Sequence, residues 1–114
     1  MRFRIDEQEH ARDITVIRLE GDIDSSAFPE LHRRLSAVNG RRRIVVDLSG
    51  LEYIDPSVLG WLVTTVIQLR PRSGGLVVVC PDPAKRQIFE LVGLDRVFPI
   101  VATLDGALHE LDRG

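Results

Sequence analysis

Apolar and charged residues alternate at the start of the chain, and later apolar residues recur in longer blocks. Phe3 and Ile5 are separated by charged residues, as in a half-exposed strand. Residues 14–19 are rich in β-branched and apolar side chains, which favours a second strand paired with the first as a hairpin. Residues 44–48 and 76–79 are almost continuously apolar, a pattern typical of central strands covered on both faces.

Helical spacing of apolar residues fills the intervals between these strands. A helix is predicted over residues 27–38, and two more follow the Asp55-Pro56 and Asp82-Pro83 pairs, where Asp can cap the helix and Pro fits its first position. The positions expected to face the core are Leu31, Leu35 and Val38, then Leu59, Leu62, Val63, Val66 and Ile67, then Ile88, Phe89 and Val92.

The last elements predicted are a strand over residues 97–101 and a short helix over residues 103–111. Pro99 cannot donate a ladder hydrogen bond, which indicates an edge strand. The predicted order is β-β-α-β-α-β-α-β-α, an α/β fold with a mixed, largely parallel sheet, an initial hairpin and about four helices. A chain of 114 residues fits one domain spanning residues 1–114.

Composition narrows the class of protein. The net charge of -2 argues against nucleic acid as the main partner, because phosphate backbones require a basic surface. No apolar run reaches the length of a membrane span, and the N-terminus has no export signal. Cys80 is the only cysteine, which excludes an internal disulfide. A cytoplasmic protein is therefore expected.

Enzymatic signatures are weak. The three histidines have no metal-ligand spacing, and Ser57 lies in no G-x-S-x-G elbow. No P-loop or Rossmann glycine pattern occurs either. We therefore expect neither an active site, nor a metal, nor a cofactor.

The strongest chemical signal is the tripeptide Asp55-Pro56-Ser57, between an apolar strand and an amphipathic helix. With Asp55 as the cap, Ser57 falls in the first helical turn, close to the positive end of the helix dipole. A phosphate on Ser57 would suit the helix but change the charge of any surface docked there. The tripeptide is thus a candidate modification site; a helix-start serine without a signalling role is the alternative.

The element order and three segments, residues 19–24, 45–60 and 81–94, resemble a STAS domain, and most closely the bacterial anti-sigma-factor antagonists. In that family the strand–helix junction reads Asp-Ser-Ser/Thr-Gly-Leu-Gly, and the second hydroxyl residue is phosphorylated by the anti-sigma factor, which is a serine kinase. Asp55, Ser57, Leu59 and Gly60 match, so the resemblance implies that Ser57 is the acceptor. Pro56 replaces the first hydroxyl residue, and Val58 replaces the glycine.

The resemblance implies partner switching: the unphosphorylated chain binds an anti-sigma factor, which releases its sigma factor, and phosphorylation of Ser57 ends that binding. A phosphatase is the further partner expected, and the chain itself is expected to be a monomer or weak dimer. The expected partner-binding residues are Asp22, Asp24, Asp55, Val58 and Trp61. For Trp61, an interface anchor and a side chain tucked against a neighbouring helix remain equal alternatives, as do partner contact and turn formation for Asp22 and Asp24.

A second function is compatible with the same family. A STAS accessory subunit of a lipid-transport or other membrane complex would bind an ATPase without a phosphate switch. Val58 favours this alternative, because a β-branched side chain beside Ser57 is expected to obstruct a kinase.

Overall fold

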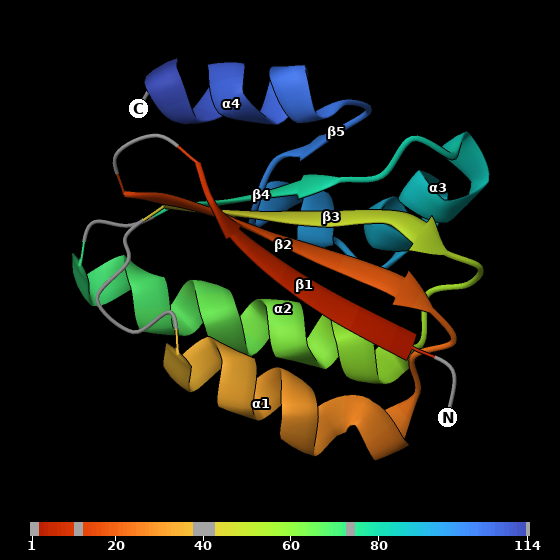
Figure 1. Ribbon diagram of the computed structural model, residues 1–114. Coiled ribbons are helices and arrows are strands. Elements are labelled where there is room, and N and C mark those ends of the chain that lie inside the picture. Colours follow the sequence, from red (N-terminus) through yellow and green to blue (C-terminus); the bar gives the residue numbers. More distant parts are fainter. Residues whose placement is uncertain (1–2, 11–12, 38–42, 73–74, 114) are drawn as a thin grey trace.

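The computed structural model describes residues 3–10, 13–37, 43–72 and 75–113, and the predicted element order is confirmed (Figure 1). The strands are β1 (Phe3–Glu9), β2 (Ile14–Gly21), β3 (Arg43–Leu51), β4 (Gly75–Val79) and β5 (Ile100–Val101). The helices are α1 (Phe28–Ala37), α2 (Pro56–Leu69), α3 (Pro83–Leu91) and α4 (Leu104–Arg113). Short 3₁₀ turns precede α1 and follow α2 and α3.

The five strands form one sheet in the order β1-β2-β3-β4-β5. The hairpin pair β1 and β2 is antiparallel, and every later pair is parallel. Helices α1 and α2 cover one face of the sheet, whereas α4 covers the other (Figure 1). The chain is therefore built in three layers, and its parallel strands direct their carboxyl ends to one edge.

Two apolar cores lie on the two sides of the sheet. The larger contains Val46 of β3, Leu62 of α2 and Phe89 of α3, all fully buried. The smaller contains Val45 of β3, Val77 of β4 and Ala107 of α4. Consecutive β3 residues thus enter opposite cores, because side chains alternate across a strand. This explains why the central strands are apolar at nearly every position.

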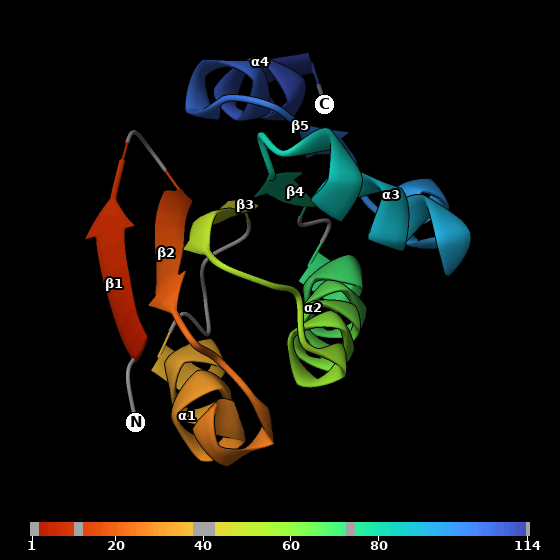
Figure 2. The ribbon, with the colours of Figure 1, turned by 90° about the vertical axis from the view of Figure 1, so that its right-hand side faces the viewer.

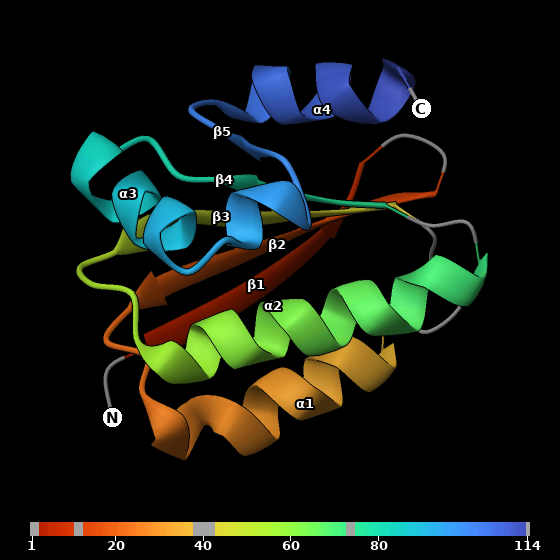
Figure 3. The same ribbon diagram turned by 180° about the vertical axis from the view of Figure 1, so that it is seen from behind.

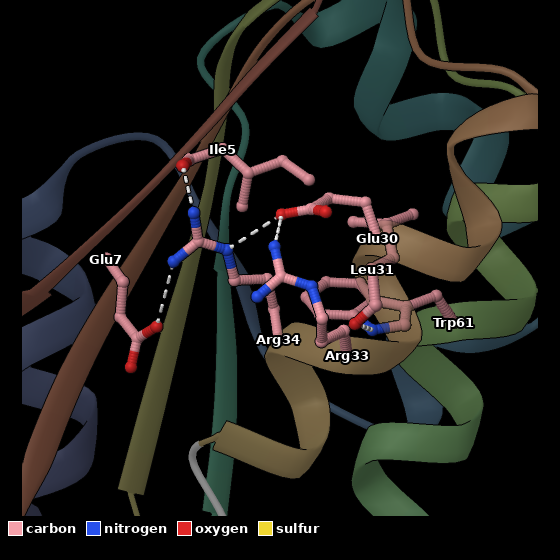
Figure 4. Close-up of polar contacts among 7 residues, drawn as sticks. All are labelled: Ile5, Glu7, Glu30, Leu31, Arg33, Arg34 and Trp61. Atoms are coloured by element: carbon pink, nitrogen blue, oxygen red, sulfur yellow. Dashed lines mark hydrogen bonds and ion pairs between the residues drawn. The ribbon is translucent and has the colours of Figure 1, made fainter.

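Helix α1 is fixed to the hairpin by polar contacts from one arginine (Figure 4). Arg34 donates to the main-chain oxygen of Ile5 at 3.3 Å and lies 3.4 Å from the Glu7 carboxylate. Its Nε also lies 3.3 Å from Glu30, which forms an ion pair with Arg33 as well. These contacts hold α1 against β1.

Three predictions about the ends and faces of elements are wrong. The last strand is Ile100–Val101 only, because Val97 and Phe98 donate their main-chain N–H groups to the Leu94 oxygen and continue the turn that starts at Leu94. Val92 is 57% exposed and Ile67 is 59% exposed, although both were expected in the core. Val92 falls beyond the last α3 residue, and Ile67 lies on the outer side of α2.

The apolar side of α2 is rotated from the predicted one. Its buried residues are Val58, Trp61, Leu62, Thr65, Val66 and Leu69. Val38 and the Leu35 side chain, predicted for the core, lie outside the described residues. Across the residues that are described, no helix is both long and apolar enough to cross a membrane.

Candidate functional site

The carboxyl ends of β2 and β3 and the N-terminus of α2 lie together at one edge of the molecule (Figure 2). Asp22 and Asp24 follow β2, and the loop from Glu52 to Asp55 follows β3. Loops at the carboxyl ends of neighbouring parallel strands meet at the same edge of the sheet. The fold therefore brings residues that are about thirty positions apart in the sequence onto one surface.

Asp55 and Ser57 are joined by two hydrogen bonds at the start of α2. The Asp55 carboxylate oxygen Oδ2 accepts the main-chain N–H of Ser57 at 2.9 Å, which is the N-cap predicted from sequence. The same oxygen accepts the Ser57 hydroxyl at 2.6 Å. Pro56 occupies the first helical turn, where no donor is required. The Ser57 side chain is thereby held at the helix N-terminus.

Ser57 is half-buried, between exposed Pro56 and fully buried Val58. Its oxygen lies near the positive end of the helix dipole, where a negative group is stabilised. Because part of the residue is exposed, the position is compatible with modification.

The charges of four carboxylates act on the hydroxyl of an exposed tyrosine beside this pair. Tyr53 is 44% exposed. Loss of hydration raises the pKa of the Tyr53 hydroxyl, and the nearby negative charges of Asp24, Asp55, Asp22 and Glu52 raise it further. Asp22, Asp24 and Asp55, all expected to bind a partner, therefore lie in the same part of the molecule. We call Asp22, Asp24, Glu52, Tyr53 and Asp55 the acidic surface.

Two of these carboxyl groups face each other directly. A hydrogen bond and charge repulsion from Asp22 raise the pKa of Glu52 above its ordinary 4.5. Asp24 differs, because hydrogen bonds from the side chain and main chain of Ser26 lower its pKa. The Asp24 carboxylate oxygen Oδ1 accepts the Ser26 N–H at 2.9 Å, so Asp24 caps the turn before α1. The turn-forming alternative is therefore correct for Asp24, which still contributes charge to the surface.

Sequence reasoning missed Glu52, Tyr53 and Lys85. Lys85 of α3 donates its Nζ to the main-chain oxygen of Leu51 at 2.7 Å, and so ties α3 to the loop that precedes Ser57. The position of Lys85 in the chain could have placed it here. Lys85 follows β4 and the loop follows β3, and these two strands are parallel neighbours. Periodicity alone carries no such information.

Asp47 lies beneath this edge of the sheet. The strand predicted over residues 44–48 continues to Leu51, so Asp47 lies inside β3. Its buried carboxylate forms an ion pair with Arg18 of β2 at 3.1 Å and accepts the Ser49 N–H at 2.9 Å. Asp47 therefore joins β2 to β3 rather than contributing to the acidic surface.

The Val58 side chain does not lie on the surface. It has no exposed area and belongs to the larger core. The expectation that it contacts a partner directly, or obstructs one, is therefore wrong. The reason is its helical position: one residue beyond Ser57 turns the side chain by about 100° toward the sheet.

Trp61 is also buried, with no exposed area. Its indole Nε1 donates to the main-chain oxygen of Leu31 in α1 at 2.9 Å (Figure 4). The alternative in which Trp61 tucks against a neighbouring helix is correct, and the interface anchor is wrong. An indole N–H commonly finds such a partner when it is buried.

The described residues contain no group of three His, Cys, Asp or Glu side chains placed to hold a metal ion. A hollow of about 80 Å³ lies beside Lys85, lined in part by Ser49 and Cys80. Burial raises the pKa of the Cys80 thiol, which disfavours a reactive thiolate.

Residues 7–103 match the family model described as "Mlab, STAS domain". This span is most of the chain, and the chain belongs to the STAS domain family. The five-stranded sheet with four helices is the fold shared with its structural neighbours.

The chain is similar to named antagonists of anti-sigma factors. It is 27% identical over 109 residues to an anti-sigma F factor antagonist of Paenibacillus polymyxa, covering 93% of each chain. It is 29% identical over 86 residues to the protein of the same name in Lysinibacillus sphaericus, covering 73% of this chain and 74% of that one. The crystal structure of an anti-sigma factor antagonist from Mycobacterium paratuberculosis aligns with a TM-score of 0.88 and 31% identity, covering 97% and 95% of the two chains. The resemblance read from the sequence is confirmed.

Proposed function

We propose that this chain is an anti-sigma-factor antagonist that phosphorylation of Ser57 switches off. The observation that carries the proposal is the half-buried Ser57 hydroxyl at the α2 N-terminus, next to the acidic surface, in a STAS chain whose relatives bear this name. The unmodified chain binds an anti-sigma factor that is also a serine kinase, and the bound sigma factor is released. The chain acts in the cytoplasm, as one domain and as a monomer or weak dimer, and a phosphatase restores the hydroxyl.

A phosphate on Ser57 leaves the fold in place. It replaces the hydroxyl hydrogen, so the 2.6 Å hydrogen bond to Asp55 is lost and two negative groups stand side by side. The helix dipole opposes this repulsion by about 0.3–1 kcal/mol. The two effects act in opposite directions, so the net effect on folding is small.

The effect on binding is much larger. A phosphate adds about −1.5 to −2 charges to a surface that already carries Asp22, Asp24, Glu52 and Asp55. Burying that charge in an interface without cationic partners costs several kcal/mol. A loss of about 3.5 kcal/mol weakens binding by roughly 300-fold. Binding therefore changes while the domain stays folded.

The test compares wild type, Ser57→Ala and Ser57→Asp. Wild type and Ser57→Ala are expected to bind the purified anti-sigma factor with similar dissociation constants, and Ser57→Asp at least tenfold more weakly. Intact-mass analysis after incubation with the kinase and ATP is expected to show one phosphate on wild type and none on Ser57→Ala. Tight binding by Ser57→Asp together with an unmodified wild-type mass would refute the proposal.

Loss of binding must be separated from loss of folding. Circular dichroism is expected to give all three variants the same spectrum, with thermal midpoints within a few degrees. Asp105→Asn on α4, on the other face of the sheet, changes charge away from the site and is expected to leave the dissociation constant unchanged.

The alternative of an accessory subunit that binds an ATPase rested on Val58 as an obstacle. The fully buried Val58 side chain removes that argument. The family model bears the name Mlab, but the relatives that cover most of the chain are named as antagonists. A stable complex with an ATPase, and no phosphate on Ser57, would favour the alternative.

A further inference from the structure

Two cations lie in the first turn of α3, the end of a helix that favours negative charge. Lys85 and Arg86 occupy this turn, and no acidic residue accompanies them there. The helix dipole disfavours a positive charge at this end, so neither side chain stabilises α3 through its position. Both side chains donate instead to main-chain oxygens outside the helix. Each cation therefore holds a neighbouring segment of the chain.

Lys85 reaches from α3 to the end of β3. Its Nζ donates to the Leu51 main-chain oxygen at 2.7 Å, a length typical of a bond from a charged donor. The carboxylate of Asp82 is farther away, at 3.9 Å, and its other oxygen accepts the Ala84 N–H at 2.9 Å as the cap of α3. The Lys85 side chain is 23% exposed, so its ammonium is partly shielded from water. The bond to Leu51 is the shortest polar contact of this ammonium among the described residues.

The Leu51 oxygen lies at the start of the loop that leads to Ser57. In Figure 3 the first turn of α3 lies at the same edge of the sheet as this loop, which runs from β3 to α2. Ile54 within the loop is 8% exposed and packs in the larger core. Asp55 then holds Ser57 through two hydrogen bonds. Lys85 therefore fixes the start of a short segment whose far end carries the hydroxyl.

The charge of Lys85 acts on the loop as well. It lowers the pKa of Glu52, against the larger effect of Asp22, which raises it. The ammonium therefore lies close enough to the loop to offset part of the negative charge there.

Arg86 holds a different segment. Its Nη1 donates to the main-chain oxygens of Cys80 and Pro81, at 2.8 Å each. These two residues follow β4, whereas the loop that leads to Ser57 follows β3. Two adjacent cations on one helix thus hold two different segments, and only Lys85 holds the one that carries the candidate modification site.

We infer that Lys85 is a positioning residue for the phosphorylation of Ser57, because its bond to the Leu51 oxygen holds the loop so that the hydroxyl meets the kinase in the required place. This rests on the proposed function and adds a residue from a different helix. In the transfer, the Ser57 oxygen bonds to the γ-phosphorus of ATP, the bond from that phosphorus to ADP breaks, and the hydroxyl proton passes to a base of the kinase. The attack requires an in-line approach, and a displacement of about 1 Å can slow such a step roughly a hundredfold.

The test uses Lys85→Met, which keeps an unbranched side chain and removes the donor. The purified chain is the substrate, and the readout is phosphate transfer from ATP by the purified anti-sigma-factor kinase. The kcat for Ser57 is expected to fall by about tenfold or more, because the hydroxyl is misplaced in the bound complex. KM is expected to stay within about threefold of wild type, because the rest of the contact surface is unchanged.

The matched control is Arg86→Met, the same substitution one residue further along α3. It removes the bonds to Cys80 and Pro81 but leaves the Leu51 oxygen bonded, so it is expected to give the wild-type kcat. Both variants lose one cation from the same turn, and circular dichroism is expected to give them similar thermal midpoints. A loss of kcat confined to Lys85→Met then reports the loop and not the stability of α3.

Hydrogen exchange of the chain alone tests the same bond without the kinase. The main-chain amides of Tyr53 and Ser57 are expected to exchange about tenfold faster in Lys85→Met than in wild type, because the loop opens more often. Their exchange in Arg86→Met is expected to equal that of wild type. Equal exchange in Lys85→Met and wild type would overturn the inference, since the bond would then not hold the loop.

The kinetic outcomes are distinct. A wild-type kcat in Lys85→Met, with normal phosphorylation of wild type, would overturn the inference and leave the proposed function intact. Equal losses of kcat in Lys85→Met and Arg86→Met would also overturn it, since α3 as a whole would then be responsible. No phosphate on wild-type Ser57 would refute the proposed function and this inference with it.

Discussion

Thr15 on β2 carries the one buried side-chain polar atom that has no hydrogen-bond partner in the described part of the chain. The residue is 1% exposed, so its hydroxyl has left water without compensation. Such burial costs about 1–3 kcal/mol. Thr and Val have nearly the same shape, and only the hydroxyl separates them.

Thr15→Val is therefore expected to raise the free energy of unfolding by about 1 kcal/mol, because it removes an unpaired polar group without leaving a cavity. Urea denaturation followed by circular dichroism measures the difference. A less stable variant would show that the hydroxyl is bonded after all.

The contact between Glu52 and Asp22 predicts how the free energy of unfolding depends on pH. The raised pKa of Glu52 means that the folded chain retains a proton that the unfolded chain has released, at pH values just above 4.5. In this window the unfolded state binds fewer protons, so this pair makes the free energy of unfolding fall as pH rises. Asp22→Asn is expected to bring the Glu52 pKa back toward 4.5 and to flatten that fall. Carboxyl NMR titration measures the Glu52 pKa in wild type and in the variant. The same Glu52 pKa in both proteins would refute the coupling.

Packing against α1 determines which side of helix α2 is buried. Nearly all of its residues are apolar, so periodicity alone offers more than one candidate stripe. Packing against α1 selects the stripe that contains Trp61, because the indole N–H reaches the Leu31 oxygen. Ile67 is left outside.

Trp61→Phe is expected to lower the free energy of unfolding by about 1–3 kcal/mol, from a lost hydrogen bond and a smaller ring between α1 and α2. Partner affinity is expected to stay unchanged under conditions where the variant is fully folded. Urea denaturation and calorimetry supply the two values. Normal stability with weakened binding would restore Trp61 as a contact residue.

The sheet separates α4 from the proposed binding surface. Helix α4 covers the smaller core, and Leu111 within it is 7% exposed. Helix α2 lies on the opposite face of the sheet from α4, and the acidic surface lies in the loops near the start of α2 (Figures 1 and 2). Changes in α4 should thus affect folding without affecting the partner.

Leu111→Ala is expected to cost about 2–3 kcal/mol of unfolding free energy, from lost apolar contact and a residual cavity. The dissociation constant for the anti-sigma factor is expected to remain within twofold of wild type at a temperature where the variant is folded. A large loss of affinity would mean that the two faces are coupled.

The element order could be predicted because each signal is local. Asp55 and Asp82 cap the helices that follow them, as their spacing before Pro indicates. The error at residues 97–101 has a local cause too, since Gly93 with φ of 80° ends α3 and starts a turn that apolar composition does not reveal.

Local chemistry along the chain was enough to place Ser57 at a capped helix start and to assign the α/β class, since caps, strand composition and helix spacing depend on neighbours within a few positions. The folded arrangement alone decided that Val58 and Trp61 turn inward, that Gly60 stands open, and that Asp22 and Glu52 meet beside Tyr53. Those outcomes depend on contacts between residues some thirty positions apart, such as Trp61 with Leu31, and periodicity within one helix cannot rank them.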